Sequence, residues 1–381
     1  RGEDKGGDRI GGSPKKGLLY MQSIIFSFIQ AAIKGRFEGD IPDCDWLQLL
    51  IKSSDQGVKG LVWQGITLME EARVAGAVTN ARAMARGDKM EWFMNIRKLE
   101  HATATLYDTS VEFAERLSPC QCVVLKGIDY ARYWPVPGYR EFGDLDIYSV
   151  DYDAANSRAQ EMGAAVHDGG YKHSHIQYKG LPIENHRYFT TFNGTKQGRE
   201  TERLLKEFLG SEFAAIGDTP LLSPNPDFTA LFMLRHAQLH FIDEGISLRH
   251  VLDWLFFLRA EQHNVDWQRV YEAMDKMQMR AFADILTAFC KEYFAWTPEN
   301  TAITASDDKR LLEKLMVDIT SPQPDVYDMR LHKKALRIVR RMRRMVTFRQ
   351  LLNESYWSRV WQTFAYSTLN PWRPAIGPPA P

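Results

Sequence analysis

The chain has few cysteines, no net charge and no long apolar run, and each absence excludes a class of protein. Its 381 residues include four cysteines and no Cys-x-x-Cys pair, which excludes a disulfide framework and a zinc site of that type. Lys plus Arg equals Asp plus Glu at 48 each, so no global field draws the protein to nucleic acid or anionic lipid. No run approaches the roughly 18–20 apolar residues of a membrane-spanning helix. These features predict a cytoplasmic protein without a transmembrane segment.

Common catalytic motifs are also absent. The sequence has no Walker A loop, GxGxxG, GxSxG or HExxH motif, which removes the usual signatures of ATPases, dehydrogenases, hydrolases and zinc proteases. The composition is still that of a globular protein, with 44% apolar and 25% charged residues. Function therefore has to be inferred from less common patterns.

Composition and hydrophobic periodicity divide the sequence into five parts. Residues 1–20 are Gly-rich and charged, which predicts a disordered leader. Residues 21–117 show helical periodicity, whereas residues 118–195 combine short strands with a helix. Residues 196–370 are again helical, and residues 371–381 form a Pro-rich tail. The predicted fold class is α+β, with a small mixed-sheet core between N- and C-terminal helical regions.

Polar residues and glycine predict where several helices begin and end. Asp45 precedes an apolar segment that starts at Trp46 and is its expected N-cap. Asp153 is the expected N-cap of a short helix that Gly163 stops. The apolar run at 24–33 matches either an amphipathic helix or the apolar part of a signal peptide.

Two aspartates lie one residue apart in an otherwise apolar strand. In "GDLDIYSV", Asp144 and Asp146 share one face because side chains alternate along a strand. Two carboxylates on one face repel each other unless a cation lies beside them. Mg²⁺ or Mn²⁺ would remove the repulsion, and such hard cations commonly bind phosphate oxygens as well. The alternative is an edge strand whose aspartates lie in water.

Other residues near the two aspartates are of the types that bind phosphate groups. Glu184 and His186 share one face of "PIENHRYF", so pairing of this strand with the aspartate strand would add a third carboxylate. Lys126 and Gly127 end the strand "CQCVVLKG", where glycine lets the backbone approach a phosphate and lysine supplies charge. Arg140 is placed to hold another phosphate oxygen.

At these residues the sequence resembles the uncharacterised nucleotidyltransferase-like family of the DNA polymerase β superfamily. The motifs that carry the resemblance are Leu125-Lys126-Gly127, Tyr133-Trp134-Pro135, Arg140, Gly143-Asp144-Leu145-Asp146 and Glu184-Asn185-His186. The resemblance covers residues 119–190 and extends more loosely to 234–254, where similar proteins carry a His-rich helix and an Arg-x-x-x-Asp segment. In better-known members of the superfamily, Ser follows the first-strand Gly, whereas this chain has Ile128.

The resemblance implies transfer of a nucleoside monophosphate from an NTP to a hydroxyl group of a small molecule, a protein side chain or an RNA end. It implies that Asp144, Asp146 and Glu184 are catalytic and hold Mg²⁺ or Mn²⁺. The substrate-binding residues that it implies are Lys126, Gly127, Arg140, Gly143 and His186. Because Ile128 replaces the expected serine, phosphate binding must differ from that of the better-known members.

Two other functions are compatible with the same carboxylates. A metal-dependent glycosyltransferase also binds a nucleotide through an Asp-x-Asp motif, but Rossmann-like strands would then precede the motif, and the first 117 residues are helical in pattern. A non-catalytic nucleotide-binding relative is the second alternative. Ile128 favours it, and retention of all three carboxylates argues against it.

Histidines outside these motifs allow more than one interpretation. His236 and His240 have the i, i+4 spacing of a helical metal site, but interior hydrogen bonding or lining of an active site explains them equally simply. His173 and His175 share a strand face and either reach the acidic cluster or lie on an exposed hairpin.

The segment 330–349 carries nine Lys or Arg residues and no acid. Leu331, Ala335, Ile338, Met342 and Met345 form an apolar stripe at helical spacing, so the basic residues occupy the other faces. This pattern is typical of a solvated helix face, and its alternative is contact with nucleic acid or another acidic surface.

Overall fold

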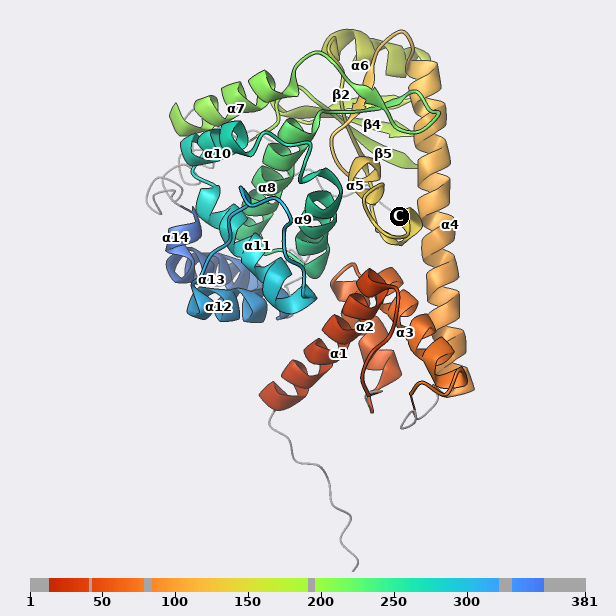
Figure 1. Ribbon diagram of the computed structural model, residues 1–381. Helices are drawn as coiled ribbons and strands as arrows, with labels where there is room; N and C mark the ends of the chain where they lie inside the picture. Colours follow the sequence, from red (N-terminus) through yellow and green to blue (C-terminus); the bar gives the residue numbers. More distant parts are fainter. Residues whose placement is uncertain (1–13, 41–42, 79–83, 191–195, 322–330, 353–381) are drawn as a thin grey trace, which may run out of the picture.

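The structure, a computed structural model, describes residues 14–40, 43–78, 84–190, 196–321 and 331–352, and it confirms the α+β fold (Figure 1). A mixed sheet packs with two groups of helices, one before it and one after it in the sequence. The N-terminal helices are α1 (Pro14–Lys34), α2 (Trp46–Asp55), α3 (Lys59–Val74) and α4 (Arg86–Leu117). No strand occurs in the described chain before Cys122, so the Rossmann-like strands that a glycosyltransferase would require are not found there.

Helix α1 is an internal element of the N-terminal group. It begins at Pro14, so the prediction of a disordered leader is wrong for residues 14–20; proline is favoured in the first helical turn, and the chain continues directly into the apolar run. That run is an amphipathic helix, with Phe28 and Ile29 completely buried. Helix α2 begins as predicted, because the Asp45 carboxylate accepts hydrogen bonds from the backbone N–H groups of the first turn.

Close contact between α1 and α3 depends on Gly65. A Cβ atom at this position would lie 2.2 Å from the Phe28 carbonyl oxygen, and backbone cannot move aside as a side chain can. We therefore expect Gly65→Ala to lower the free energy of unfolding by about 3 kcal/mol, measured by urea denaturation. Gly87 in α4 is the matched control, because a Cβ there meets no atom within 4 Å, and Gly87→Ala should leave stability unchanged or higher. Equal effects of the two substitutions would contradict this packing account.

The sheet brings distant strands together in the order β3-β4-β5-β2-β1-β7-β6. The strands described are β1 (Cys122–Val124), β2 (Leu145–Tyr148), β3 (Ala165–Asp168), β4 (His173–Tyr178), β5 (Leu181–His186), β6 (Ala214–Ala215) and β7 (Leu221–Ser223). Strand β2 is antiparallel to β1 and parallel to β5, and β4 and β5 form an antiparallel hairpin. Strands β2 and β5 are therefore neighbours, and their side chains form one face.

Three details of this region differ from the sequence prediction. Strands β6 and β7 lie inside 196–370, which was predicted to be helical, because two- and three-residue strands are too short to show a period. Strand β3 was not predicted. Helix α6 (Tyr152–Glu161) is capped by Asp151 and not by Asp153: the chain is still extended at Asp151, whose carboxylate accepts from the N–H of Ala154.

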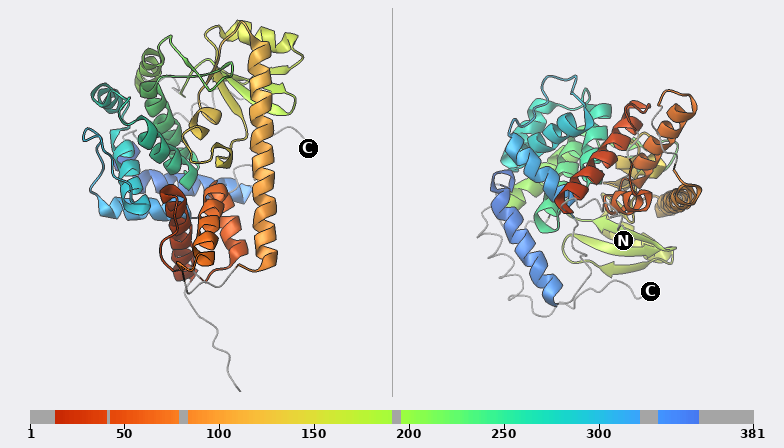
Figure 2. Two further views of the ribbon diagram at one scale, coloured as in Figure 1. Left: turned by 45° about the vertical axis from the view of Figure 1, so that its right-hand side comes forward. Right: turned by 90° about the horizontal axis from the view of Figure 1, so that it is seen from below.

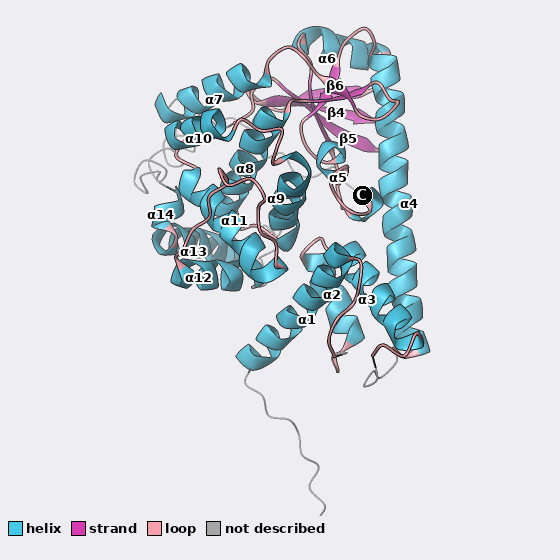
Figure 3. Ribbon diagram, viewed as in Figure 1, coloured by secondary structure: helices cyan, strands magenta, loops and turns pink. Residues whose placement is uncertain are grey.

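Helices cover the sheet and hold it against the rest of the molecule. The long helix α4 runs alongside the sheet (Figure 2), and Phe113 and Leu117 pack against buried strand residues such as Ile147 and Ile183. Two short helices follow β1, α5 (Ile128–Ala131) and the 3₁₀ turn η1 (Pro137–Tyr139). They connect the core to the C-terminal helices, which stand beside the sheet in Figure 3.

The C-terminal group is mostly a bundle of apolar helices. It consists of α7 (Lys196–Leu209), α8 (Pro226–Asp243), α9 (Leu248–Glu261), α10 (Trp267–Lys276), α11 (Arg280–Phe294), α12 (Lys309–Thr320), α13 (Leu331–Thr347) and α14 (Arg349–Leu352). Helix α9 is buried over most of its surface, as its nearly continuous apolar sequence predicts. Within the described ranges, no helix combines the length and the apolar character needed to cross a membrane. The predicted tail at 371–381 lies outside the described residues.

One basic side chain of helix α13 is buried in the protein interior. The Arg344 guanidinium lies 2.9 Å from the Asp318 carboxylate and is almost fully buried. The predicted apolar stripe is confirmed at Met345, which is buried, and wrong at Met342, which is 43% exposed. Arg343 is exposed, so a basic face remains, and its contact with an acidic partner stays a prediction.

Candidate active site

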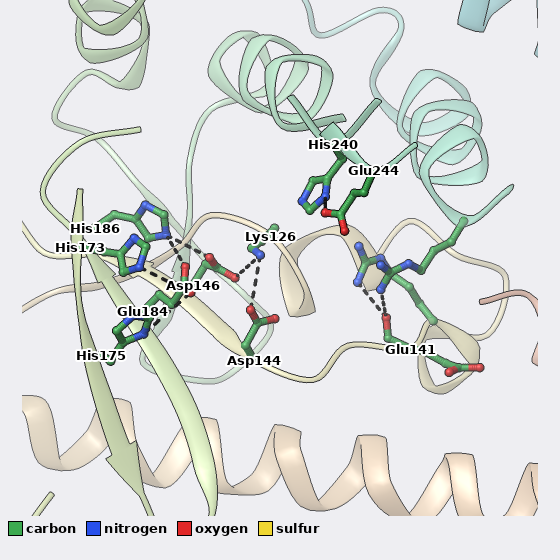
Figure 4. A network of polar contacts seen from close by, with 12 residues as sticks. Lys126, Glu141, Asp144, Asp146, His173, His175, Glu184, His186, His240 and Glu244 are labelled. Atoms are coloured by element: carbon green, nitrogen blue, oxygen red, sulfur yellow. Dashed lines mark hydrogen bonds and ion pairs between the residues drawn. The ribbon is translucent and has the colours of Figure 1, made fainter. Parts of the chain in front are cut away.

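The parallel pairing of β2 with β5 assembles three carboxylates. Asp146 and Glu184 are direct partners in the register of the two strands, and Asp144 lies one residue before β2. Carboxylate oxygens of these three residues lie within 4.8 Å of one another (Figure 4). The prediction that Glu184 joins the aspartates is therefore confirmed, and the alternative of a water-exposed edge strand is wrong: β2 is an inner strand, and Asp146 is 1% exposed.

Lys126 lies directly against the two aspartates. Its Nζ atom is 2.9 Å from Asp146 Oδ2 and 3.5 Å from Asp144 Oδ2. Burial opposes the charge of the lysine, but the two carboxylates outweigh it and raise the pKa of Lys126. Burial together with the charge of Asp146 raises the pKa of Asp144. The ammonium group thus compensates part of the negative charge of the cluster.

His186 binds the cluster from the other side. Its Nε2 atom is 2.9 Å from Asp146 Oδ1 and 3.5 Å from Glu184 Oε2, while Nδ1 is 3.2 Å from the carbonyl oxygen of Tyr188. Both ring nitrogens face acceptors, so the imidazolium form donates at each. Burial disfavours that form, but the bonds to Asp146 and Glu184 raise the pKa of His186. Burial would also raise the pKa of Asp146, yet Lys126 and His186 reverse this effect and lower it.

His173 and His175 reach the acidic cluster, which confirms the first of their two interpretations. They belong to β4, where His173 pairs with His186 and His175 pairs with Glu184. His173 Nε2 and His175 Nδ1 lie 3.6 and 3.9 Å from the same oxygen of Glu184. The ligand atoms of His173, Glu184 and His186 also lie within 4.8 Å of one another, but a metal ion there would require a neutral His186 that releases one of its present acceptors.

The three carboxylates are suited to a hard divalent cation. They offer oxygen ligands, which Mg²⁺ and Mn²⁺ prefer. Asp146 Oδ2 is buried and lies 2.9 Å from Lys126 Nζ, so a cation would bind through the lone pair of this oxygen that the ammonium group does not face. His186 fixes the other oxygen of Asp146, as a neighbouring group commonly does for a metal ligand.

Lys126 gives a direct test of charge compensation at this site. We expect Lys126→Met to lower the free energy of unfolding in the absence of divalent cations by about 2–3 kcal/mol, because it leaves buried carboxylate charge unpaired. Millimolar Mg²⁺ should then raise the Tm of the variant more than that of the native protein, since the ion replaces the lost positive charge. Thermal denaturation with EDTA and with Mg²⁺ measures both effects. A variant that Mg²⁺ does not stabilise would contradict the proposed metal ligands.

A cavity of about 410 Å³ opens beside the carboxylates. The segments beside strands β1 and β2 contribute Lys126, Gly127, Gly143 and Asp144 to its wall. Helices α8 and α9 contribute His236, His240, Arg249, His250 and Asp253, and the loop between these two helices completes that side. His236 and His240 therefore line the cavity, as one of their interpretations predicted. His240 Nδ1 is 2.6 Å from Glu244 Oε1.

Glycine and isoleucine shape the end of β1. Gly127 has φ of +66°, which favours glycine, and it precedes α5 directly. Ile128 is 4% exposed and belongs to the hydrophobic core formed by buried residues of the sheet and of helix α4. The position that carries Ser in better-known members thus faces the protein interior here and offers the cavity no hydroxyl group.

Arg140, a predicted phosphate ligand, is held by a carboxylate. Its Nε and NH2 groups donate to the two oxygens of Asp253 at 2.7 and 2.8 Å, and Trp134 donates to the same residue. Arg140 lines the cavity, but Asp253 accepts from two of its five N–H donors, and the Glu141 backbone carbonyl accepts from NH1 at 3.4 Å. Sequence reasoning assigned no role to Arg249, which lines the same cavity. The Arg-x-x-x-Asp segment was the signal that could have identified it.

Comparison with family models gives a match over most of the chain. A family model described as an uncharacterised nucleotidyltransferase matches residues 42–295. This range includes the N-terminal helices from α2 onward, the sheet, and the helices α8 and α9 that line the cavity. Neither the curated proteins nor the solved structures contain a match.

Proposed function

Since the chain belongs to this uncharacterised nucleotidyltransferase family, we propose that it transfers a nucleoside monophosphate from an NTP to a hydroxyl acceptor in a reaction that depends on Mg²⁺ or Mn²⁺. The meeting of Asp144, Asp146 and Glu184 beside a 410 Å³ cavity is the observation that carries the proposal. The family supports nucleotidyl transfer in general. The metal, the NTP donor and the hydroxyl acceptor are our inference from the site.

Asp144, Asp146 and Glu184 would hold the metal. A divalent cation supplies positive charge that stabilises the triphosphate during attack at the α-phosphorus. His186 orients Asp146 and Glu184 through its two contacts on Nε2. Gly127 and Gly143 leave the cavity wall open to phosphate, because neither places a side chain there. Lys126 adds a positive charge beside them.

The acceptor hydroxyl would attack the α-phosphorus, and the bond between that phosphorus and the bridging oxygen of the β-phosphate would break. Pyrophosphate leaves with the bonding electrons. Glu184 is the candidate that aligns the hydroxyl or accepts its proton, since it lies at the cluster and is 25% exposed, unlike Asp146. Burial would favour the neutral acid, but the hydrogen bond with His186 lowers the pKa of Glu184, so the group is ionised and able to accept a proton.

Calorimetric titration of ATP, GTP, CTP and UTP, each with Mg²⁺ and with EDTA, tests the proposal without knowledge of the acceptor. We expect at least one NTP to bind only with the cation present. Asp144→Asn/Asp146→Asn should remove this cation-dependent binding. Binding of nucleotide sugars but of no NTP would favour the glycosyltransferase alternative, and binding of neither would reject a nucleotide site.

A further inference from the structure

Arg249 is a cation of the cavity wall that has no carboxylate partner. It lies in the first turn of α9, and NH1 donates its one hydrogen bond, 2.8 Å long, to the backbone carbonyl of Glu141. Among the described residues, no carboxylate oxygen lies within ion-pair distance of its guanidinium group. A guanidinium group has five N–H donors, so most of those of Arg249 remain available.

The nearby carboxylates are occupied by other groups. Asp253 accepts both of the short bonds from Arg140, Glu141 lies 3.3 Å from Lys59 Nζ, and Glu244 bonds to His240. Burial, and next the charge of Arg140, lower the pKa of Arg249. Among the described residues, the Arg249 guanidinium group is therefore left without a carboxylate in direct contact. An uncompensated, mostly buried charge is costly unless a ligand pairs with it.

The N-terminal helices hold Arg249 in this position. The Gln56 side chain and backbone carbonyl accept hydrogen bonds from the first turn of α9, at the N–H groups of Leu248 and Arg249. The aliphatic part of Arg249 packs against Gly57, where an added Cβ would lie 3.2 Å from Arg249 Cδ. A side chain fixed in this way loses little further entropy when it binds a ligand.

The cavity joins this guanidinium group to the carboxylates. Lys126, Gly127 and Asp144 line it together with Arg249 and His250. An NTP whose α-phosphate lies at the carboxylates would have its β- and γ-phosphates further along the cavity wall. Guanidinium groups match phosphate oxygens through two parallel hydrogen bonds.

We infer that Arg249 binds the β- and γ-phosphates of the NTP and, after transfer, the pyrophosphate product. This inference rests on the proposed nucleotidyltransferase function. It also assigns a role to the N-terminal helices: they position the residue that recognises a triphosphate. Arg140 then acts as a positioning residue, because it pairs with Asp253 of the same helix as Arg249 and so keeps that carboxylate from pairing with Arg249.

Nucleotides of different phosphate number test the inference. The NTP that binds most tightly, its NDP, its NMP and inorganic tripolyphosphate are titrated with Mg²⁺ into the full chain and into Arg249→Gln, Arg249→Lys and Arg259→Gln. Arg259 is the control, because it is an exposed arginine of the same helix outside the cavity. We expect Arg249→Gln to weaken NTP and tripolyphosphate binding about ten- to a hundredfold and NMP binding less than twofold. The NTP affinity of Arg249→Lys should lie between those of Arg249→Gln and the native chain, and the NTP affinity of Arg259→Gln should equal that of the native chain.

Two results would overturn the role of Arg249. One is unchanged NTP affinity in Arg249→Gln, and the other is an equal loss for NTP and NMP, which would indicate a structural role. Thermal denaturation separates these cases further, since removal of an uncompensated charge should not lower the Tm. If the native chain binds no NTP, the proposed function fails, and the tripolyphosphate titrations then test Arg249 separately. Tripolyphosphate binding that is lost in Arg249→Gln would support an anion site at Arg249. No tripolyphosphate binding to the native chain would reject that site.

Discussion

Asp146→Asn is expected to weaken NTP binding in the presence of Mg²⁺ at least about a hundredfold, to the level measured with EDTA. Asp146 is the most buried of the three carboxylates and accepts from His186 while it contacts Lys126. An amide keeps the shape of the side chain but removes the charge and one oxygen ligand. A hundredfold loss corresponds to about 2.7 kcal/mol of binding free energy. Calorimetric titration measures it.

Asp153→Asn is the matched control for this experiment. Asp153 belongs to the same α/β core, is 82% exposed and pairs with Arg187 on the surface. Its replacement should change NTP affinity less than twofold. If Asp146→Asn retains cation-dependent NTP binding at native strength, the carboxylates do not hold the metal. Equal losses in both variants would indicate a non-specific effect of charge.

Asp253→Asn is expected to lower the free energy of unfolding by about 3–5 kcal/mol. The Asp253 carboxylate accepts from both Nε and NH2 of Arg140 and from Trp134, and Asp253 and Arg140 are each about 95% buried as side chains. The amide leaves the guanidinium charge in the interior without compensation. Chemical denaturation of the native chain and the variant measures the difference.

A double-mutant cycle identifies the cause of that loss. Asp253→Asn/Arg140→Met removes both charges, so it should recover part of the stability lost in Asp253→Asn. Glu100→Gln is a control at an exposed pair, because Arg97 and Glu100 are 64% and 33% exposed, and it should cost less than about 1 kcal/mol. A loss in Asp253→Asn no larger than in Glu100→Gln would contradict the account of the buried pair.

The sequence predicted the parts of the site that lie within single strands. Alternation placed Asp144 with Asp146, and Glu184 with His186, on common faces, and this information is local. The parallel pairing of β2 with β5 joins the two sets, and it depends on a register that alternation alone does not specify. The resemblance supplied the expectation that the two strands meet, and the structure confirms it.

Contacts between distant segments explain what the sequence did not predict. Arg140 was expected to hold phosphate, yet its partner Asp253 lies 113 residues further along the chain. Gln56 and Gly57 act on Arg249 from another helical group, and no local pattern links them. Strands β6 and β7 are too short for a periodic signal, and they join the sheet because β7 pairs with β1 and β6 pairs with β7.

An experiment that identifies which phosphate bond of the NTP is broken tests the central claim most directly. The protein, Mg²⁺ and either [α-³²P]NTP or [γ-³²P]NTP are incubated with small-molecule, protein and RNA fractions as separate sources of acceptor. The account predicts that α-label is transferred to material in one fraction while γ-label is released as pyrophosphate, and that Asp144→Asn/Asp146→Asn does neither. Transfer of γ-label, or its release as orthophosphate, would contradict nucleotidyl transfer, and NTP binding with no pyrophosphate from any fraction would support a non-catalytic relative.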